Sequence, residues 1–184
     1  MQKIKLSFLS VLLSFSHFCK AQVFISKAVN TSFFSETPVE NIDANSTSGN
    51  SILNTQTSDL VFRIPMTSYK FKNSLMEEHF NENYMKSSKY PQAEFKGKIN
   101  EKLDWLKDGT YNVTVTGKLT MHGVEKDRTI PGTITIAGNQ ISIASKFEVP
   151  LKDHKIDVPK LVVKNIAEII SVNVKANYQP YVKK

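Results

Sequence analysis

The sequence predicts an all-β protein, an antiparallel barrel or sandwich, and three observations support this prediction. Apolar and polar residues alternate along six segments, which is the period of a strand that buries one face. Turn residues such as Asp108-Gly109 and Gly138-Asn139 bound these segments at hairpin-like spacing. Only one segment has helical periodicity, whereas an α/β sheet needs strands and helices in alternation.

The N-terminal residues have the features of a secretory signal. Lys3 and Lys5 precede an apolar run at residues 6–18, and Ala21 is a small residue suited to cleavage. The run is too short to span a membrane as a helix. We therefore expect cleavage after Ala21, one mature domain of residues 22–184, and a periplasmic or secreted location. Cys19 raises the alternative of a lipid anchor, but bulky residues precede it where a lipidation signal has small ones.

The mature chain would carry neither cysteine nor concentrated charge. Cys19 is the one cysteine, so cleavage leaves no disulfide, thiol nucleophile or cysteine metal ligand. The formal net charge of +7 falls to +4 once Lys3, Lys5 and Lys20 are removed. The remaining lysines are scattered, which is typical of a solvated surface and not of a nucleic-acid site. We expect no nucleic-acid partner, while peripheral contact with an anionic membrane stays open, as does the oligomeric state, a dimer included.

The region before residue 59 has the weakest pattern. Residues 23–28, 32–35 and 39–44 are predicted as short strands, and the polar run NSTSGN at 45–50 as a turn or loop.

The six alternating segments follow, at residues 59–66, 92–99, 111–123, 132–138, 141–148 and 166–176. The third is the longest. From Tyr111 to Met121 its odd positions are apolar except for Gly117, and its even positions are polar. A glycine in the middle of such a strand predicts a bend or a bulge. The stretch VPLKDHKIDVPKLVV at 149–163 carries Pro150 and Pro159 and is expected to be an irregular connection before the last strand.

Residues 73–91 break the strand pattern and predict a short helix between two strands. Ser74 and Glu77 have the S-x-x-E spacing of a capping box, and Pro91 ends any continuation. The apolar residues between them recur at i, i+4 and i+8 and so share one helix face: Met76, Phe80 and Tyr84. We expect this helix to plug or flank one mouth of a barrel.

The sequence contains no pattern that indicates catalysis or metal binding. Three histidines follow the cleavage site, and none has the spacing of a metal site. His79 lies beside the apolar helix face and His122 on the polar face of its strand, where water or a loop would meet it. We interpret both as structural and expect His154, among charges, to be exposed. We therefore expect no catalytic residue, no metal and no cofactor.

The apolar strand faces allow two interpretations. In the first, side chains fill the core and no ligand is needed. In the second, the faces line a lumen, because an eight-stranded barrel is just wide enough either to be filled or to hold one small ligand. Periodicity alone does not choose between them.

Three stretches of the chain resemble the YceI-like family. Within residues 64–99, a histidine-bearing helix precedes a K-Y-P-x-A-x-F strand start, here Lys89 to Phe95. The run GKLTMHGVEKDRTI at 117–130 is similar to the family's G-x-L-T-hydrophobic-H-G-V motif, and residues 147–160 with the last strand complete a match over roughly 60–176. The N-terminus departs from the family, whose members commonly begin with Trp or Tyr and then D-x-x-H-S. Here the segment reads VFISKAVNTSFFSETP, and the only tryptophan is Trp105.

The resemblance implies an antiparallel eight-stranded β-barrel of lipocalin-like shape, exported and non-enzymatic. It also implies that the lumen binds a polyisoprenoid or a similar apolar lipid chain. The resemblance and the alternation together place fourteen residues in the wall of the lumen, with the last of them on the helix closing its mouth: Phe62, Ile64, Met66, Phe95, Val113, Val115, Leu119, Met121, Ile143, Phe147, Ile170, Val172, Val174 and Phe80.

Overall fold

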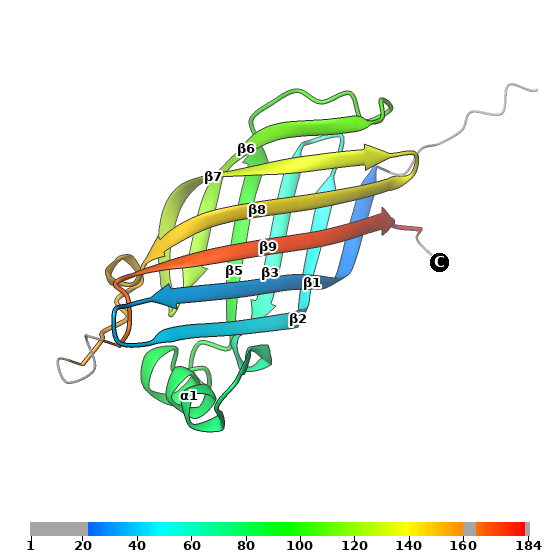
Figure 1. Cartoon of the computed structure of the whole chain (residues 1–184). Coiled ribbons are helices and arrows are strands. Elements are labelled where there is room, and N and C mark those ends of the chain that lie inside the picture. The colour runs from blue at the N-terminus through cyan, green and yellow to red at the C-terminus, as the bar shows by residue number, and fades with distance from the viewer. Residues whose placement is uncertain (1–21, 160–164, 183–184) are drawn as a thin grey trace, which may run out of the picture.

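A computed structural model describes residues 22–159 and 165–182, which form a β-barrel with a short helix at one end (Figure 1). The predicted signal, Cys19 and the expected cleavage after Ala21 lie outside the described residues. The elements are, in chain order, β1 (Val23–Glu36), β2 (Asn41–Asn54), β3 (Asp59–Pro65), η1 (Met66–Ser68), β4 (Lys70–Phe71), α1 (Ser74–His79), η2 (Phe80–Tyr84), β5 (Gln92–Ile99), β6 (Gly109–Met121), β7 (Val124–Ala137), β8 (Gln140–Pro150), η3 (Leu151–His154) and β9 (Ile169–Pro180).

Eight of the nine strands in the described part of the chain close into an antiparallel ring. Their order is β1-β9-β8-β7-β6-β5-β3-β2, and pairing of β1 with β2 completes the circle. The two-residue β4 adds to the free part of β2. The predicted antiparallel eight-stranded barrel is therefore confirmed, and the six alternating segments correspond to β3 and β5 to β9.

Residues 45–50 lie inside β2, so their prediction as a turn or loop is wrong. β1 and β2 are two long strands that pair along their length, with register shifts on either side of Val29. The inward positions of β2 carry small residues, among them Ala44, Ser46 and Ser51, which are buried. A Cβ at Gly49 would lie 2.3 Å from Ile64 Cδ1, so this part of the wall has no room for larger side chains. Because the inward residues of β2 are small or polar, the strand does not show the alternation of apolar and polar residues by which strands were predicted.

Of the predicted bend or bulge at Gly117 of β6, the bulge is absent. The pairing of β6 runs without a register shift on both sides, and Gly117 lies directly opposite Gly97 of β5. A Cβ on Gly117 would lie 2.2 Å from the Lys96 carbonyl oxygen and 2.3 Å from Gly97 Cα. The glycine therefore permits a close approach of two backbones.

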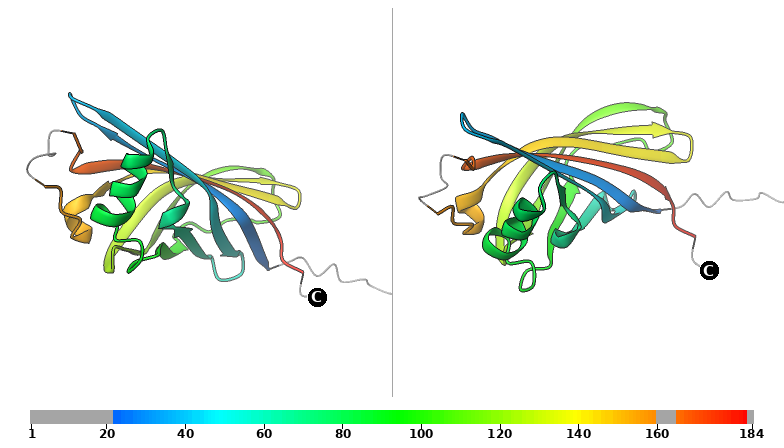
Figure 2. Two further views of the ribbon diagram at one scale, coloured as in Figure 1. Left: turned by 90° about the horizontal axis from the view of Figure 1, so that it is seen from below. Right: turned by 60° about the horizontal axis from the view of Figure 1, so that its bottom comes forward.

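Two ladders of the barrel stop part-way. β7 pairs with β8 only as far as Thr133 and Ala144, and Pro131, which has no N–H to donate, follows on the unpaired side. On the opposite side of the barrel, the pairing of β2 with β3 ends at Asn50 and Arg63. Toward this end the strands separate into two sheets, and α1, η2 and η3 lie at the opening (Figures 1 and 2).

The predicted helix forms, but with a different N-cap. Asn73, not Ser74, is the cap, since its side-chain oxygen accepts the Leu75 N–H at 2.8 Å. Glu77 bonds Lys70 Nζ at 2.7 Å instead of closing a capping box. The helix continues as the π-helical turn η2. No helix in residues 22–159 or 165–182 is long and apolar enough to cross a membrane.

We predict that Gly117→Ala destabilises the barrel by about 1–3 kcal/mol, because the added methyl group forces the Lys96 carbonyl and its ladder apart. Urea denaturation of the purified protein measures this change. Asn112→Ala, at an exposed position of the same strand, is the control and should change stability by less than about 0.5 kcal/mol. Equal stabilities of the two variants would contradict the close-approach explanation.

Candidate functional site

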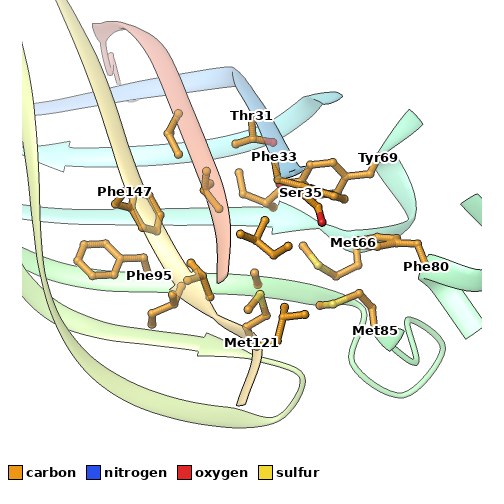
Figure 3. Close-up of a pocket in the computed structure, with 18 of the residues that line it drawn as sticks. Thr31, Phe33, Ser35, Met66, Tyr69, Phe80, Met85, Phe95, Met121 and Phe147 are labelled. Carbon is orange, nitrogen blue, oxygen red and sulfur yellow. The ribbon is translucent and has the colours of Figure 1, made fainter. Parts of the chain in front are cut away.

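A cavity of about 420 Å³ lies between the two sheets at the helical end of the barrel (Figure 3). All eight barrel strands contribute to its wall, together with η1, α1 and η2. Its volume falls within the roughly 300–1,000 Å³ of typical small-molecule sites. The space is therefore large enough for a ligand and is enclosed mainly by apolar side chains.

The fourteen residues predicted for the wall all line this cavity, and the structure adds others from the N-terminal strands. Contact of the fourteen with a ligand stays a prediction. The full predicted set is Phe62, Ile64, Met66, Phe80, Phe95, Val113, Val115, Leu119, Met121, Ile143, Phe147, Ile170, Val172 and Val174.

Sequence reasoning missed the part of the wall that comes from β1. Thr31, Phe33 and Ser35 project into the cavity from this strand, and Tyr69 approaches beside Phe33 (Figure 3). The sequence did contain a signal for these residues, because every second side chain in this part of β1 points inward. It was weak because two of the three inward side chains are hydroxyl residues, which read as polar.

Four aromatic rings attach the helical segment to the barrel at the mouth of the cavity. Phe80 of η2 lies against Phe33, Tyr69 and Phe71, with ring centroids 5.4, 5.7 and 5.1 Å away. Each such pair contributes about 0.5–1.5 kcal/mol beyond the area that it buries. Phe80 thus lies at the mouth, where the sequence predicted it.

The opposite end of the barrel is filled. Beyond Thr31 the next inward residue of β1 is Val29, which is buried along with Leu53. Tyr178 is 1% exposed and donates its hydroxyl hydrogen to Ser51 Oγ at 2.5 Å, since Ser51 itself donates to the Val61 carbonyl at 2.6 Å. Burial raises the pKa of the Tyr178 phenol. The cavity is therefore a blind tunnel that is closed at this end of the barrel.

The charged groups of the wall are few and already paired. Glu94 bonds Arg63 and Lys96, and these hydrogen bonds lower its pKa below the usual range. Glu40 accepts from Asn165 Nδ2 at 3.1 Å. Within residues 22–159 and 165–182, no group of three His, Cys, Asp or Glu side chains is placed to hold a metal ion.

His154 is buried, so the expectation that it is exposed is wrong. The turn η3 carries it beneath the end of β7, where its Nδ1–H donates to the Val124 carbonyl at 3.1 Å. Burial lowers its pKa. His122 donates in turn to the His154 carbonyl at 3.0 Å, so it meets a loop as predicted. The two histidines fasten η3 to the β6–β7 turn.

The two motifs of residues 89–95 and 117–124 lie against each other. The His122 ring packs edge-on against Tyr90 with centroids 4.8 Å apart. A Cβ at Gly123 would lie 2.4 Å from Tyr90 Cε1, and φ is +73° there, so only glycine suits the turn. The motifs therefore describe one packing unit at the rim of the cavity.

Comparison with known proteins identifies both a family and a fold. The sequence pattern of the YceI-like domain matches residues 15–178. A polyisoprenoid-binding domain from Saccharophagus degradans has a TM-score of 0.74 at 13% identity, over 88% of this chain and 100% of that one. BcnA of Burkholderia cenocepacia has a TM-score of 0.68 at 14% identity, over 81% and 95%. At these identities the likeness concerns the fold. No curated protein matches the sequence.

We predict that stability falls as the pH drops below about 6.5, in part because of His154. Its folded-state pKa is depressed below about 6.5, so the unfolded chain binds a proton that the folded chain does not. The stability that neutral His154 contributes is present in full at pH values above the pKa that this histidine has in the unfolded chain. It is lost as the pH falls through the lower pKa of His154 in the folded protein. His154→Asn, which keeps an N–H for Val124, should flatten the decline by up to about 1.4 kcal/mol per pH unit in urea titrations. An unchanged slope would contradict the assignment.

Proposed function

The chain belongs to the YceI-like domain family, and from this premise we propose that it binds one apolar lipid, a polyisoprenoid or a chain of similar shape, without catalysis. The observation that carries the proposal is the blind apolar tunnel of about 420 Å³. A barrel whose only role is structural would be expected to fill this space, because protein interiors pack to the density of organic crystals.

The mechanism that we propose is sequestration. An apolar chain lies along the tunnel, water leaves its surface, and the polar outer faces of the strands keep the complex in solution. The rings of Phe95 and Phe147 provide broad contacts along the tunnel, and Met66, Met85 and Met121 provide flexible ones that adapt to an irregular chain (Figure 3).

We further propose that the protein works outside the cytoplasm and takes its ligand from a lipid surface. The signal-like residues 1–21 support export. Peripheral contact with a membrane is supported by three of the exposed large apolar side chains, which lie on elements near the mouth: Val39 in the β1–β2 turn, Leu75 on α1 and Ile169 at the start of β9. Such side chains can enter the headgroup layer while the mouth faces the lipid.

We predict that a polyisoprenoid raises the melting temperature of the purified protein. A ligand that binds only the folded state at one hundred times its Kd stabilises it by about 2.7 kcal/mol, which is roughly 5–10 °C for a domain of this size. Thermal unfolding with added geranylgeraniol measures the shift. Mass spectrometry of organic extracts of the purified protein tests for a lipid that it already carries. Empty extracts together with no thermal shift would refute lipid binding and favour the structural role.

We predict that Val172→Trp blocks binding while the barrel still folds. The Val172 side chain lines the tunnel from β9, so the larger ring occupies the space that the lipid would take. Affinity for geranylgeraniol should fall at least tenfold in a fluorescence titration. Lys175→Trp, on the outward face of the same strand, is the matched control and should bind as the wild type does. Equal loss in both variants would show that the effect is not steric blocking of the tunnel.

A further inference from the structure

Thr31 carries a buried hydroxyl group that makes no hydrogen bond of good geometry. The residue is 4% exposed, its side chain lines the tunnel, and its Oγ1 has no such bond with any residue in the described part of the chain. Leaving a buried hydroxyl unpaired costs free energy, and valine would fit the same strand position with the same shape. A residue that destabilises the empty protein in this way indicates a partner that the empty protein lacks.

A second hydroxyl group lies next to the first. Tyr69, between η1 and β4, is 6% exposed and packs its ring on Phe33 with centroids 5.3 Å apart. Burial raises the pKa of its phenol, so the group keeps its proton and can donate it. A hydrogen bond with the Thr31 side chain lowers the pKa of this phenol in part, although the contact lies outside ordinary hydrogen-bond geometry.

The Thr31 hydroxyl group lies inside the tunnel, inward of the mouth where the Tyr69 ring packs on Phe80. Thr31 pairs with Val174 of β9 and is the innermost residue that β1 contributes to the wall, since Val29 already belongs to the filled end. Ser35, nearer the mouth, already accepts the Ala167 N–H at 2.8 Å. The Thr31 hydroxyl group is therefore placed for a ligand atom inside the tunnel, and Tyr69 lies between it and the mouth.

The surroundings of Thr31 and Tyr69 favour a neutral partner. The described residues of the wall include no lysine or arginine, and the two carboxylates among them, Glu40 and Glu94, bond other side chains. An ionised group at the depth of Thr31 would lose its water without gaining a counter-charge. A hydroxyl or carbonyl oxygen needs only the hydrogen bonds that these residues can provide.

We propose that Thr31 and Tyr69 form a subsite for one neutral oxygen of the lipid, so that the ligand is a chain alcohol or carbonyl compound that enters with its oxygen-bearing end inward. This inference rests on the lipid binding proposed above and specifies the ligand class. Tyr69 donates to the ligand oxygen, and Thr31 donates to it or accepts from it.

The test compares three probes that share one carbon chain: geranylgeraniol, the hydrocarbon without its hydroxyl group, and geranylgeranyl diphosphate. We expect the wild type to bind the alcohol roughly 2–12-fold more tightly than the hydrocarbon, as one net hydrogen bond allows. The diphosphate should bind more weakly than the alcohol. Thr31→Val should lose the preference for alcohol, keep its affinity for the hydrocarbon and, without ligand, melt at a higher temperature than the wild type.

Tyr69→Phe provides a second variant with the same expected loss of preference. Ile134→Val is the control, because it removes only a methyl group from the tunnel wall and should weaken alcohol and hydrocarbon equally. Equal binding of alcohol and hydrocarbon by the wild type, or a preference that survives in both hydroxyl variants, overturns the subsite and leaves lipid binding intact. Tightest binding of the diphosphate also overturns it. Binding of none of the probes overturns the proposed function and the subsite together.

Discussion

The interruption of two strand ladders is the constraint on which the rest of this structure depends. A closed eight-stranded barrel is only just wide enough either to be filled by its own side chains or to hold one small ligand. Here β7 leaves β8 near Pro131, and β2 leaves β3 beyond Asn50, so the strands separate into two sheets toward one end. The separation creates the tunnel, and it also exposes apolar strand faces that something must cover.

The helical segment and η3 provide that cover, and each is attached by a small set of contacts. Phe80 inserts among three rings of the N-terminal half of the chain. The pair His122 and His154 fastens η3 on the other side. The packing of Tyr90 on the β6–β7 turn explains in physical terms why two motifs almost thirty residues apart occur together.

The fourteen residues that sequence reasoning predicted all line the cavity, but it missed polar wall residues such as Thr31 and also the apolar Ile130 and Ile134 of β7. Leu119, Ile143 and Val172 lie on faces that alternate strictly, so their inward direction follows from strand geometry alone. The full length of β2 was not predicted because its inward residues are small. Thr31 was not predicted because the sequence alone does not distinguish a hydroxyl residue on an inward face from one on the surface. The prediction that His154 is exposed was wrong for a related reason. Its burial depends on a turn that packs against a strand distant in sequence.

The shallow attachment of the helix has a consequence for the rate of ligand exchange. None of the residues of α1 or η2 is fully buried, whereas the barrel behind them contains a continuous core. Segments with few buried contacts open at a small fraction of the free energy of global unfolding. Release of a lipid would then need only the departure of Phe80 from its three neighbours. Under the proposed lipid binding, the residence time of the ligand and the lifetime of the fold would therefore be set by different parts of the chain, and mutation would alter one without the other.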